Sequence, residues 1–195
     1  MLLEHAEDLV YFLDELEHET DRGLPLVGAA VIDEKLHETL KAFFVKRKSS
    51  TKLLSEPNAP LGTFSSRIEA CYALALIDEF EYNEIGLIRK IRNEFAHAKH
   101  GVSFENEKIK KLCTSLQSPF SIFGKCRADT PRFRLRNAIV CIVLRLYHRS
   151  EWVVNERLQP RTWVPDSRWY ITNENSPRKN EGFMGLVPIP AKDEG

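Results

Sequence analysis

Apolar residues recur along most of the chain at the three- and four-residue spacing of amphipathic helices, and this pattern predicts the fold. Within residues 4–19, acidic side chains alternate with leucine and phenylalanine at helical spacing. A longer helix is predicted to run to about Val45, with Thr20 or Asp21 as its N-terminal cap. Gly28 and the small residues around it predict that another helix packs closely against this one.

The middle of the chain predicts two more helices after a polar connection. Ser65 or Ser66 is expected to cap a helix that continues to Leu76. Asp78 is expected to begin the next helix, which ends near Gly101. The acidic residues just after Asp78 complement the positive end of the helix dipole.

The last third of the chain first continues the helical pattern and then loses it. A short helix over residues 106–116 precedes a loop, and Pro131 suits the first position of a final long helix. After about Glu156, prolines and polar residues dominate. The sequence therefore predicts an all-α fold: one domain of about six helices over residues 1–156, followed by an irregular, proline-rich tail over 157–195 that is partly disordered at its end.

Charge is balanced over the whole chain but not along it. The net charge is zero, whereas a dedicated DNA-binding domain carries a basic excess. Residues 1–40 contain eleven acidic and two basic residues, and residues 85–150 contain fourteen basic and four acidic ones. We expect the acidic first helices to pack near the basic later ones. The alternative is a dipolar molecule whose basic side meets an acidic partner or nucleic acid.

The cysteines and the apolar runs indicate a soluble protein without a metal centre. The four cysteines are far apart, so neither a zinc signature nor a disulfide framework is expected, and no cofactor is predicted. The longest unbroken apolar run, Ala138 to Leu144, is too short to span a bilayer. The N-terminus turns acidic at once, unlike a signal peptide, and we expect a cytoplasmic protein.

The stretch from Ile88 to His97 holds the candidate chemistry. A helix turns by about 100° per residue, so the apolar side chains of this predicted helix lie on one face. Side chains that carry guanidinium, amide and imidazole groups lie on the opposite face, within roughly 140° of arc. This set consists of Arg89, Arg92, Asn93, His97 and His100. So many donors on so few turns require a carboxylate partner, an anion or water. Asp21, Asp33 and Glu69 are candidate partners within the chain, and a ligand site is the alternative.

Three blocks of sequence resemble the mannitol operon repressor family. They are Asp21-Arg22-Gly23 with the small-residue stretch that follows, Ala59-Pro60-Leu61-Gly62-Thr63-Phe64-Ser65-Ser66-Arg67-Ile68, and Ile88-Arg89-Lys90-Ile91-Arg92-Asn93-Glu94-Phe95-Ala96-His97. The likeness covers roughly residues 20–115. It implies an all-helical, non-enzymatic transcriptional regulator that acts through a protein partner or as a dimer.

The sequence agrees with an indirect mode of regulation. It contains no helix-turn-helix pattern with a short glycine-containing turn and a basic recognition helix, so direct DNA binding is not expected. The predicted binding surface combines the polar face with charged residues of the other two blocks. Its residues are Asp21, Arg22, Arg67, Arg89, Arg92, Asn93 and His97.

A second resemblance gives an alternative function. The spacing from Arg92 to His97 is similar to the R-x4-H motif of the HEPN superfamily, which includes metal-independent ribonucleases that act on RNA. That resemblance implies Arg92 as a phosphate clamp, His97 as the acid or base, and Asn93 as an orienting residue. An imidazole with a pKa near 6.5 is suited to that proton transfer.

Overall fold

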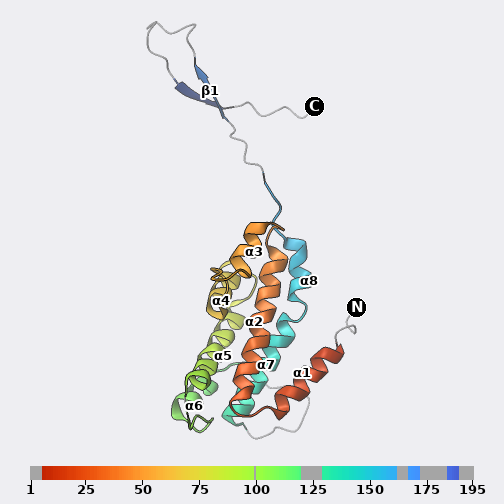
Figure 1. The fold of residues 1–195 in the computed structure, drawn as a ribbon, viewed down its shortest axis with the longest axis vertical. Coiled ribbons are helices and arrows are strands. Elements are labelled where there is room, and N and C mark those ends of the chain that lie inside the picture. Colours follow the sequence, from red (N-terminus) through yellow and green to blue (C-terminus); the bar gives the residue numbers. More distant parts are fainter. Residues whose placement is uncertain (1–5, 99, 120–128, 162–166, 172–183, 189–195) are drawn as a thin grey trace. The chain divides into compact units, whose positions relative to one another are not determined.

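The computed structural model describes residues 6–98, 100–119, 129–161, 167–171 and 184–188. Side chains are described only from residue 10 to residue 161. The chain divides into two compact units, Met1–Leu158 and Gln159–Gly195. The first unit is helical, and the second contains a pair of strands (Figure 1).

Eight α-helices and a short 3-10 helix make up the described part of the first unit, which confirms the expected all-α fold. The helices are α1 (Ala6–His18), α2 (Gly23–Phe43), α3 (Lys48–Leu54), α4 (Phe64–Ala73), α5 (Glu79–His97), α6 (Glu107–Thr114), α7 (Pro131–Leu146) and α8 (Arg149–Val153), followed by η1 (Val154–Glu156). Two of these helices, α3 and α8, have only seven and five residues. Helices this short give no clear periodic pattern, so the structure has more helices than the six predicted from the sequence.

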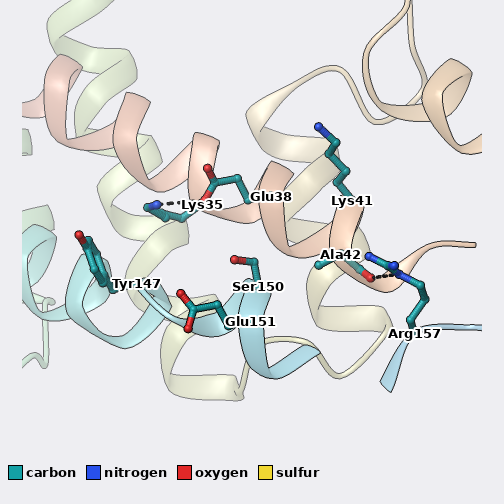
Figure 2. A pocket seen from close by; sticks show the side chains of 8 residues that line it. All are labelled: Lys35, Glu38, Lys41, Ala42, Tyr147, Ser150, Glu151 and Arg157. Carbon is teal, nitrogen blue, oxygen red and sulfur yellow. Dashed lines mark hydrogen bonds and ion pairs between the residues drawn. The ribbon is translucent and has the colours of Figure 1, made fainter. Parts of the chain in front are cut away.

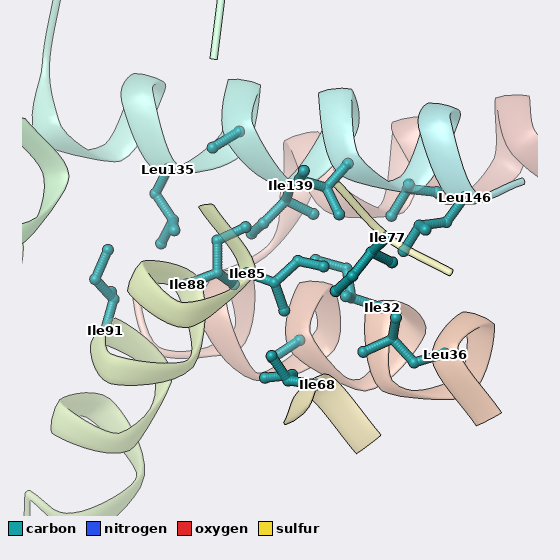
Figure 3. Close-up of a cluster of buried hydrophobic side chains, with 14 of the residues drawn as sticks. Ile32, Leu36, Ile68, Ile77, Ile85, Ile88, Ile91, Leu135, Ile139 and Leu146 are labelled. Atoms are coloured by element: carbon teal, nitrogen blue, oxygen red, sulfur yellow. The ribbon is translucent and has the colours of Figure 1, made fainter. Parts of the chain in front are cut away.

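Helix α2 is the centre of the unit. It packs against α4, α5, α7 and α8, and α5 also packs against α7 (Figure 1). Isoleucines and leucines of these helices interdigitate to form one apolar core (Figure 3). Ile32 and Leu36 on α2, Ile88 on α5 and Ile139 on α7 are fully buried. Burying such side chains supplies the main driving force for assembling the helices.

Gly28 confirms the close helix packing expected from the small residues of α2. A Cβ atom at this position would lie 2.5 Å from Cδ1 of Ile139, which is far inside normal contact distance. The absence of a side chain therefore lets Ile139 of α7 pack directly on the backbone of α2. Ala29 beside it is also buried, whereas Ala30 is exposed.

Of the expected helix caps, Asp78 at the start of α5 is confirmed. Arg22 occupies the cap position of α2, although the Thr20 hydroxyl accepts a hydrogen bond from the Gly23 amide at 2.9 Å. Pro131 begins α7 as predicted. The prediction for α4 is also corrected: α4 is capped by Thr63, and Ser66 is its partner in a capping box. Ser66 lies at the third helical position rather than at the cap because Thr63 offers the earlier hydroxyl.

The acidic beginning of the chain does pack against the basic helix α7. Arg132 forms an ion pair with Asp21, with its Nη1 3.1 Å from the carboxylate, and also donates to the Glu19 carbonyl. Arg136 pairs with Glu17 of α1. These arginines lie near the start of α7, where the helix dipole disfavours positive charge, and the acidic partners offset that disadvantage. The expected packing of the acidic first helices near the basic later ones is thus confirmed for α7.

Two carboxylates on α5 are buried in this unit and are balanced in different ways. Glu81 accepts hydrogen bonds from the guanidinium groups of Arg145 and Arg149, at 2.9 and 2.7 Å. Glu84 accepts instead from neutral donors, the backbone amide of Gln117 at 2.6 Å and the hydroxyl of Ser118 at 2.6 Å. Glu81 therefore joins α5 to α7 and α8, and Glu84 fixes the segment after α6.

Buried cysteines behave as small apolar residues. Burial raises the pKa of the Cys71 thiol to about 12, and it does the same for Cys113. Both thiols are thus protonated and unreactive at neutral pH. Cys141 is partly exposed, and Cys126 lies outside the described residues.

The second unit contains two strands, β1 (Ser167–Ile171) and β2 (Met184–Pro188), which pair antiparallel with Ser167 opposite Pro188. Periodicity predicted no strands in this region, and the pair departs from that expectation. Each strand has only five residues, which is too short for a clear alternating signal, although β1 is rich in the residue types that favour strands.

No helix in the described part of the chain is both long enough and apolar enough to span a bilayer.

Candidate binding site on helix α5

Helix α5 is fixed at its start and along its inner face, and this orients its polar face. The Asp78 carboxylate accepts from the Glu81 amide at 2.8 Å, and the Glu81 side chain accepts from the Asp78 amide at 3.0 Å. This reciprocal capping box satisfies two amides at the helix N-terminus. Farther along, Ile88, Ile91 and Phe95 are fully buried. The residues between them necessarily turn away from the core.

Four of the predicted site residues share this outward side of α5. We call Arg89, Arg92, Asn93 and His97 the α5 ridge. His97 is exposed, and the other three are half-buried. Arg92 donates from Nη1 to Oδ1 of Asn93 at 3.0 Å. Within the described residues, neither Arg89 nor His97 makes a side-chain hydrogen bond or an ion pair.

Arg22 joins the C-terminal end of the ridge. Its Nη2 donates to the Ala96 carbonyl at 3.4 Å, although the two residues are far apart in sequence. The last carbonyls of a helix have no partner within the helix, and they carry partial negative charge. The guanidinium of Arg22, which immediately precedes α2, therefore contacts the backbone of Ala96, the residue next to His97.

The three carboxylates expected to neutralise the ridge are engaged elsewhere, so that prediction is wrong. Asp21 pairs with Arg132 on α7, and Asp33 pairs with Arg67 on α4 at 2.8 Å. Glu69 accepts a hydrogen bond from the Tyr82 hydroxyl at 3.1 Å. Each of these carboxylates has a nearer donor than the ridge, and only the packing of the helices determined which donor that would be.

Arg67 holds the connection before α4 in place. Its Nε donates to the Leu61 carbonyl at 3.0 Å, while its Nη1 contacts Asp33 of α2. Its guanidinium is thus shared between a loop and a neighbouring helix. Among the seven predicted residues, the structure therefore gathers five at or beside the ridge and gives Asp21 and Arg67 ion pairs of their own.

A cavity of about 490 Å³ opens next to Arg89. It lies between α4, α5 and the segment after α6, and Glu69, Tyr82, Lys90 and Gln117 also line it. Basic and acidic groups face this cavity together, so it suits polar ligands or the polar side chains of a partner.

Two tyrosines beside this cavity were not identified from the sequence. Tyr72 and Tyr82 stack with ring centroids 4.2 Å apart. The pKa of the Tyr82 hydroxyl is raised, first by its hydrogen bond to Glu69 and then by the charge of that carboxylate. Tyr72 is exposed. Aromatic residues of this kind are enriched at protein interfaces, but their stacking depends on the packing of α4 on α5.

No metal site is present among the described residues, since no group of three or more histidine, cysteine or carboxylate side chains is arranged to hold an ion.

Comparisons with known proteins identify a family and a fold. The sequence profile of the family described as "Mannitol repressor" matches residues 8–124. A chain of the solved structure described as "X-ray structure of the MtlR-HPr complex from Escherichia coli" superposes with a TM-score of 0.51 at 19% identity. That match covers 75% of this chain and 98% of the other, so it shows a common fold. No curated protein matched.

Proposed function

The chain belongs to the mannitol repressor family, and from this membership we propose that it is a cytoplasmic transcriptional regulator that acts by binding a protein partner. The similar solved structure is described as a complex of MtlR with HPr. We extend this to the present chain and propose an HPr protein as its partner.

The observation that carries the proposal is the α5 ridge. The side chains of Arg89 and His97 make no hydrogen bond or ion pair among the described residues, and the three carboxylates proposed as partners of the ridge are paired with other groups. Cationic and imidazole groups such as those of Arg89 and His97, which a rigid helix holds without side-chain partners among the described residues, are suited to acceptors on another protein. Arginine is also among the residues most often found at the energetic centre of an interface.

Zero net charge supports a protein partner over DNA. Phosphate neutralisation supplies most of the affinity of DNA-binding proteins, and this chain has as many acidic as basic residues. Arg132 and Arg136 on α7, which could otherwise contact phosphates, are paired with Asp21 and Glu17. We therefore propose that the chain regulates transcription through a protein partner and does not bind the operator DNA itself.

The direct test measures binding of purified HPr, from the organism that encodes this chain, by calorimetry. We expect wild-type protein to bind and the double variant Arg89→Ala/Arg92→Ala to bind at least about tenfold more weakly, because truncating interface arginines commonly costs about 1 kcal/mol or more. Lys52→Ala removes one exposed positive charge from α3 and is the matched control, for which no change is expected.

Thermal unfolding separates a binding role from a structural one. Arg92 bonds only to its neighbour Asn93 among the described residues. We thus expect Arg92→Ala to change the stability by less than about 0.5 kcal/mol. A markedly lower melting temperature would make the ridge a packing element. Specific operator binding by the purified chain, without binding to HPr, would contradict the indirect mechanism.

A ribonuclease of the HEPN type is the second candidate, and the exposed imidazole of His97 is the observation that favours it. Arg92 and His97 are five residues apart and so point roughly 140° away from each other around the helix. A single chain therefore does not direct both side chains at one phosphate. A shared active site would need the corresponding residues of a second copy.

We expect purified protein to leave RNA intact in EDTA. A ribonuclease would instead cleave it without metal and leave 2′,3′-cyclic phosphate ends. In that case His97→Ala should reduce the rate by about 10²- to 10⁴-fold, the usual effect of losing a general acid or base. Cleavage that is equal in wild type and His97→Ala would reveal a contaminating nuclease.

A further inference from the structure

A groove of about 570 Å³ lies where α2 ends and α3 begins, on a different part of the helical unit from the α5 ridge. It is lined by Lys41, Phe44, Val45, Lys46, Arg47, Lys48, Ser50, Thr51, Leu54, Ser55 and Arg157. Five of these residues are basic and none is acidic. Figure 2 shows Lys41 and Arg157 from the neighbouring pocket, which shares both residues.

Four of the five cations of this groove have no ion-pair partner within the described part of the chain. Lys41, Lys46, Arg47 and Lys48 are exposed and form no ion pair there. Arg47 precedes α3 and Lys48 begins it, a position where the helix dipole disfavours positive charge. Elsewhere in this protein, arginines in the same situation at the start of α7 have carboxylate partners. Lys41, Lys46, Arg47 and Lys48 have no such partner among the described residues.

The base of the groove is apolar and its wall carries hydroxyls. Leu54 is buried, and Phe44 and Val45 are partly buried. The Ser50 hydroxyl donates to the Val45 carbonyl at 2.6 Å, which closes the turn between the two helices. Arg157 is held in place by donating from Nε to the Ala42 carbonyl at 2.7 Å (Figure 2). The groove is thus bounded by a fixed guanidinium and a closed turn.

We propose that this groove binds a small organic phosphate, a phosphate monoester whose dianion lies among the lysines and arginines and whose organic part lies on the apolar base. The volume is within the range of small-molecule sites. Arginine and lysine pair strongly with phosphate, and a dianion offsets more of the mutual repulsion between these cations than a monoanion does. This proposal is independent of the partner-binding role of the α5 ridge.

His37 is a natural reporter of such binding. Its imidazole lies 3.2 Å from the Ser55 hydroxyl of the groove wall. Its pKa is lowered first by burial and then by the charges of Arg67 and Lys41, while Asp33 and Glu38 act in the opposite direction. A dianion beside Lys41 would offset part of that positive potential. Ligand binding should therefore raise the pKa of His37, which NMR titration measures.

Calorimetry with phenyl phosphate tests the site on the full chain. We expect saturable binding to wild-type protein, and binding at least about tenfold weaker to Arg47→Ala/Lys48→Ala. Both side chains are exposed, so the variant should keep the wild-type melting temperature. Lys52→Ala is the control, because Lys52 is an exposed cation on the same helix that does not line the groove.

Other probes decide what the groove recognises. Benzoate has a similar ring with a single charge and should bind more weakly, as should inorganic phosphate, which lacks an organic part. Equal binding of either would overturn the assignment to a phosphate monoester. Absence of saturable phenyl phosphate binding, or unchanged binding in the double variant, would overturn the site itself. Neither result bears on HPr, whose binding Arg47→Ala/Lys48→Ala should leave unchanged.

Discussion

Replacing Glu81 by glutamine is expected to lower the free energy of unfolding by about 3 kcal/mol. The Glu81 carboxylate is fully buried and lies between two guanidinium groups, those of Arg145 on α7 and Arg149 on α8. Glutamine keeps the size of the side chain but removes the charge. Arg149 would then be left without its carboxylate partner in a largely dehydrated site, which is the costly way to break an ion pair. Arg145 would keep its second carboxylate partner, Asp78, whose Oδ2 lies 2.5 Å from its Nη2.

The expected loss lies at the low end of values for buried pairs because Arg145 is 40% exposed and keeps part of its hydration. Arg149 also donates to the Leu76 carbonyl, at 2.6 Å, which lowers its dependence on Glu81. Chemical denaturation of wild type and variant measures the difference. Glu79→Gln is the control: Glu79 is exposed in the same first turn, and a change within about 0.5 kcal/mol is expected there.

A loss as small as that of the control would mean that Asp78 and the Leu76 carbonyl, which already accept from Arg145 and Arg149, are sufficient without Glu81. The ion-pair cluster would then contribute little to the attachment of α8, and the apolar contacts of α8 with α2 would be the main attachment.

Removing the second buried carboxylate, by Glu84→Ala, is expected to cost about 2 kcal/mol. Glu84 accepts from the amides of Gln117 and Ser118 and from the Ser118 hydroxyl. Ser118 is buried, so its backbone and hydroxyl donors would lose the carboxylate that satisfies them inside the protein. The expected cost is smaller than for Glu81 because Gln117 is exposed and its amide can be hydrated.

Hydrogen exchange distinguishes this local effect from general destabilisation. In Glu84→Ala, the Ser118 amide should exchange much faster than expected from the change in global stability, while the Ile88 amide in the middle of α5 should follow global stability. Equal acceleration of the two amides would contradict a local role for Glu84 in holding the segment after α6.

Much of the helical architecture follows from local rules that the sequence displays. Asp78 and Asn106 cap the helices that follow them, and Pro131 occupies the first position of α7. Thr63 was missed as a cap because Ser65 and Ser66 are equally suitable residue types nearby. Choosing among adjacent hydroxyls depends on where the chain turns, and the turn is set by contacts such as that of Arg67 with Leu61.

The candidate site was predictable only as a set of side chains on one helix. The i, i+4, i+8 spacing places Arg89, Asn93 and His97 on one side of α5 without any tertiary information. By contrast, the contact of Arg22 with Ala96 and the stacking of Tyr72 on Tyr82 join segments that are distant in the sequence. The basic groove at the start of α3 was likewise not identified, because Lys41 and Arg157 come together only through the packing of α2 with α8 and η1.

The sequence by itself determined the helical class, the cap of α5 and the face of α5 on which the ridge lies, because helix periodicity and capping depend on residues within a few positions of each other. The tertiary structure alone decided which charges are paired. As far as the sequence is concerned, Asp21, Asp33 and Glu69 could each bind several cations. The packing of α2, α4, α5 and α7 gave each of them a donor that is not one of the four ridge residues. Ion pairing falls off steeply with distance and dehydration, so the pairing pattern, and with it the face left open for a partner, is a property of the folded molecule.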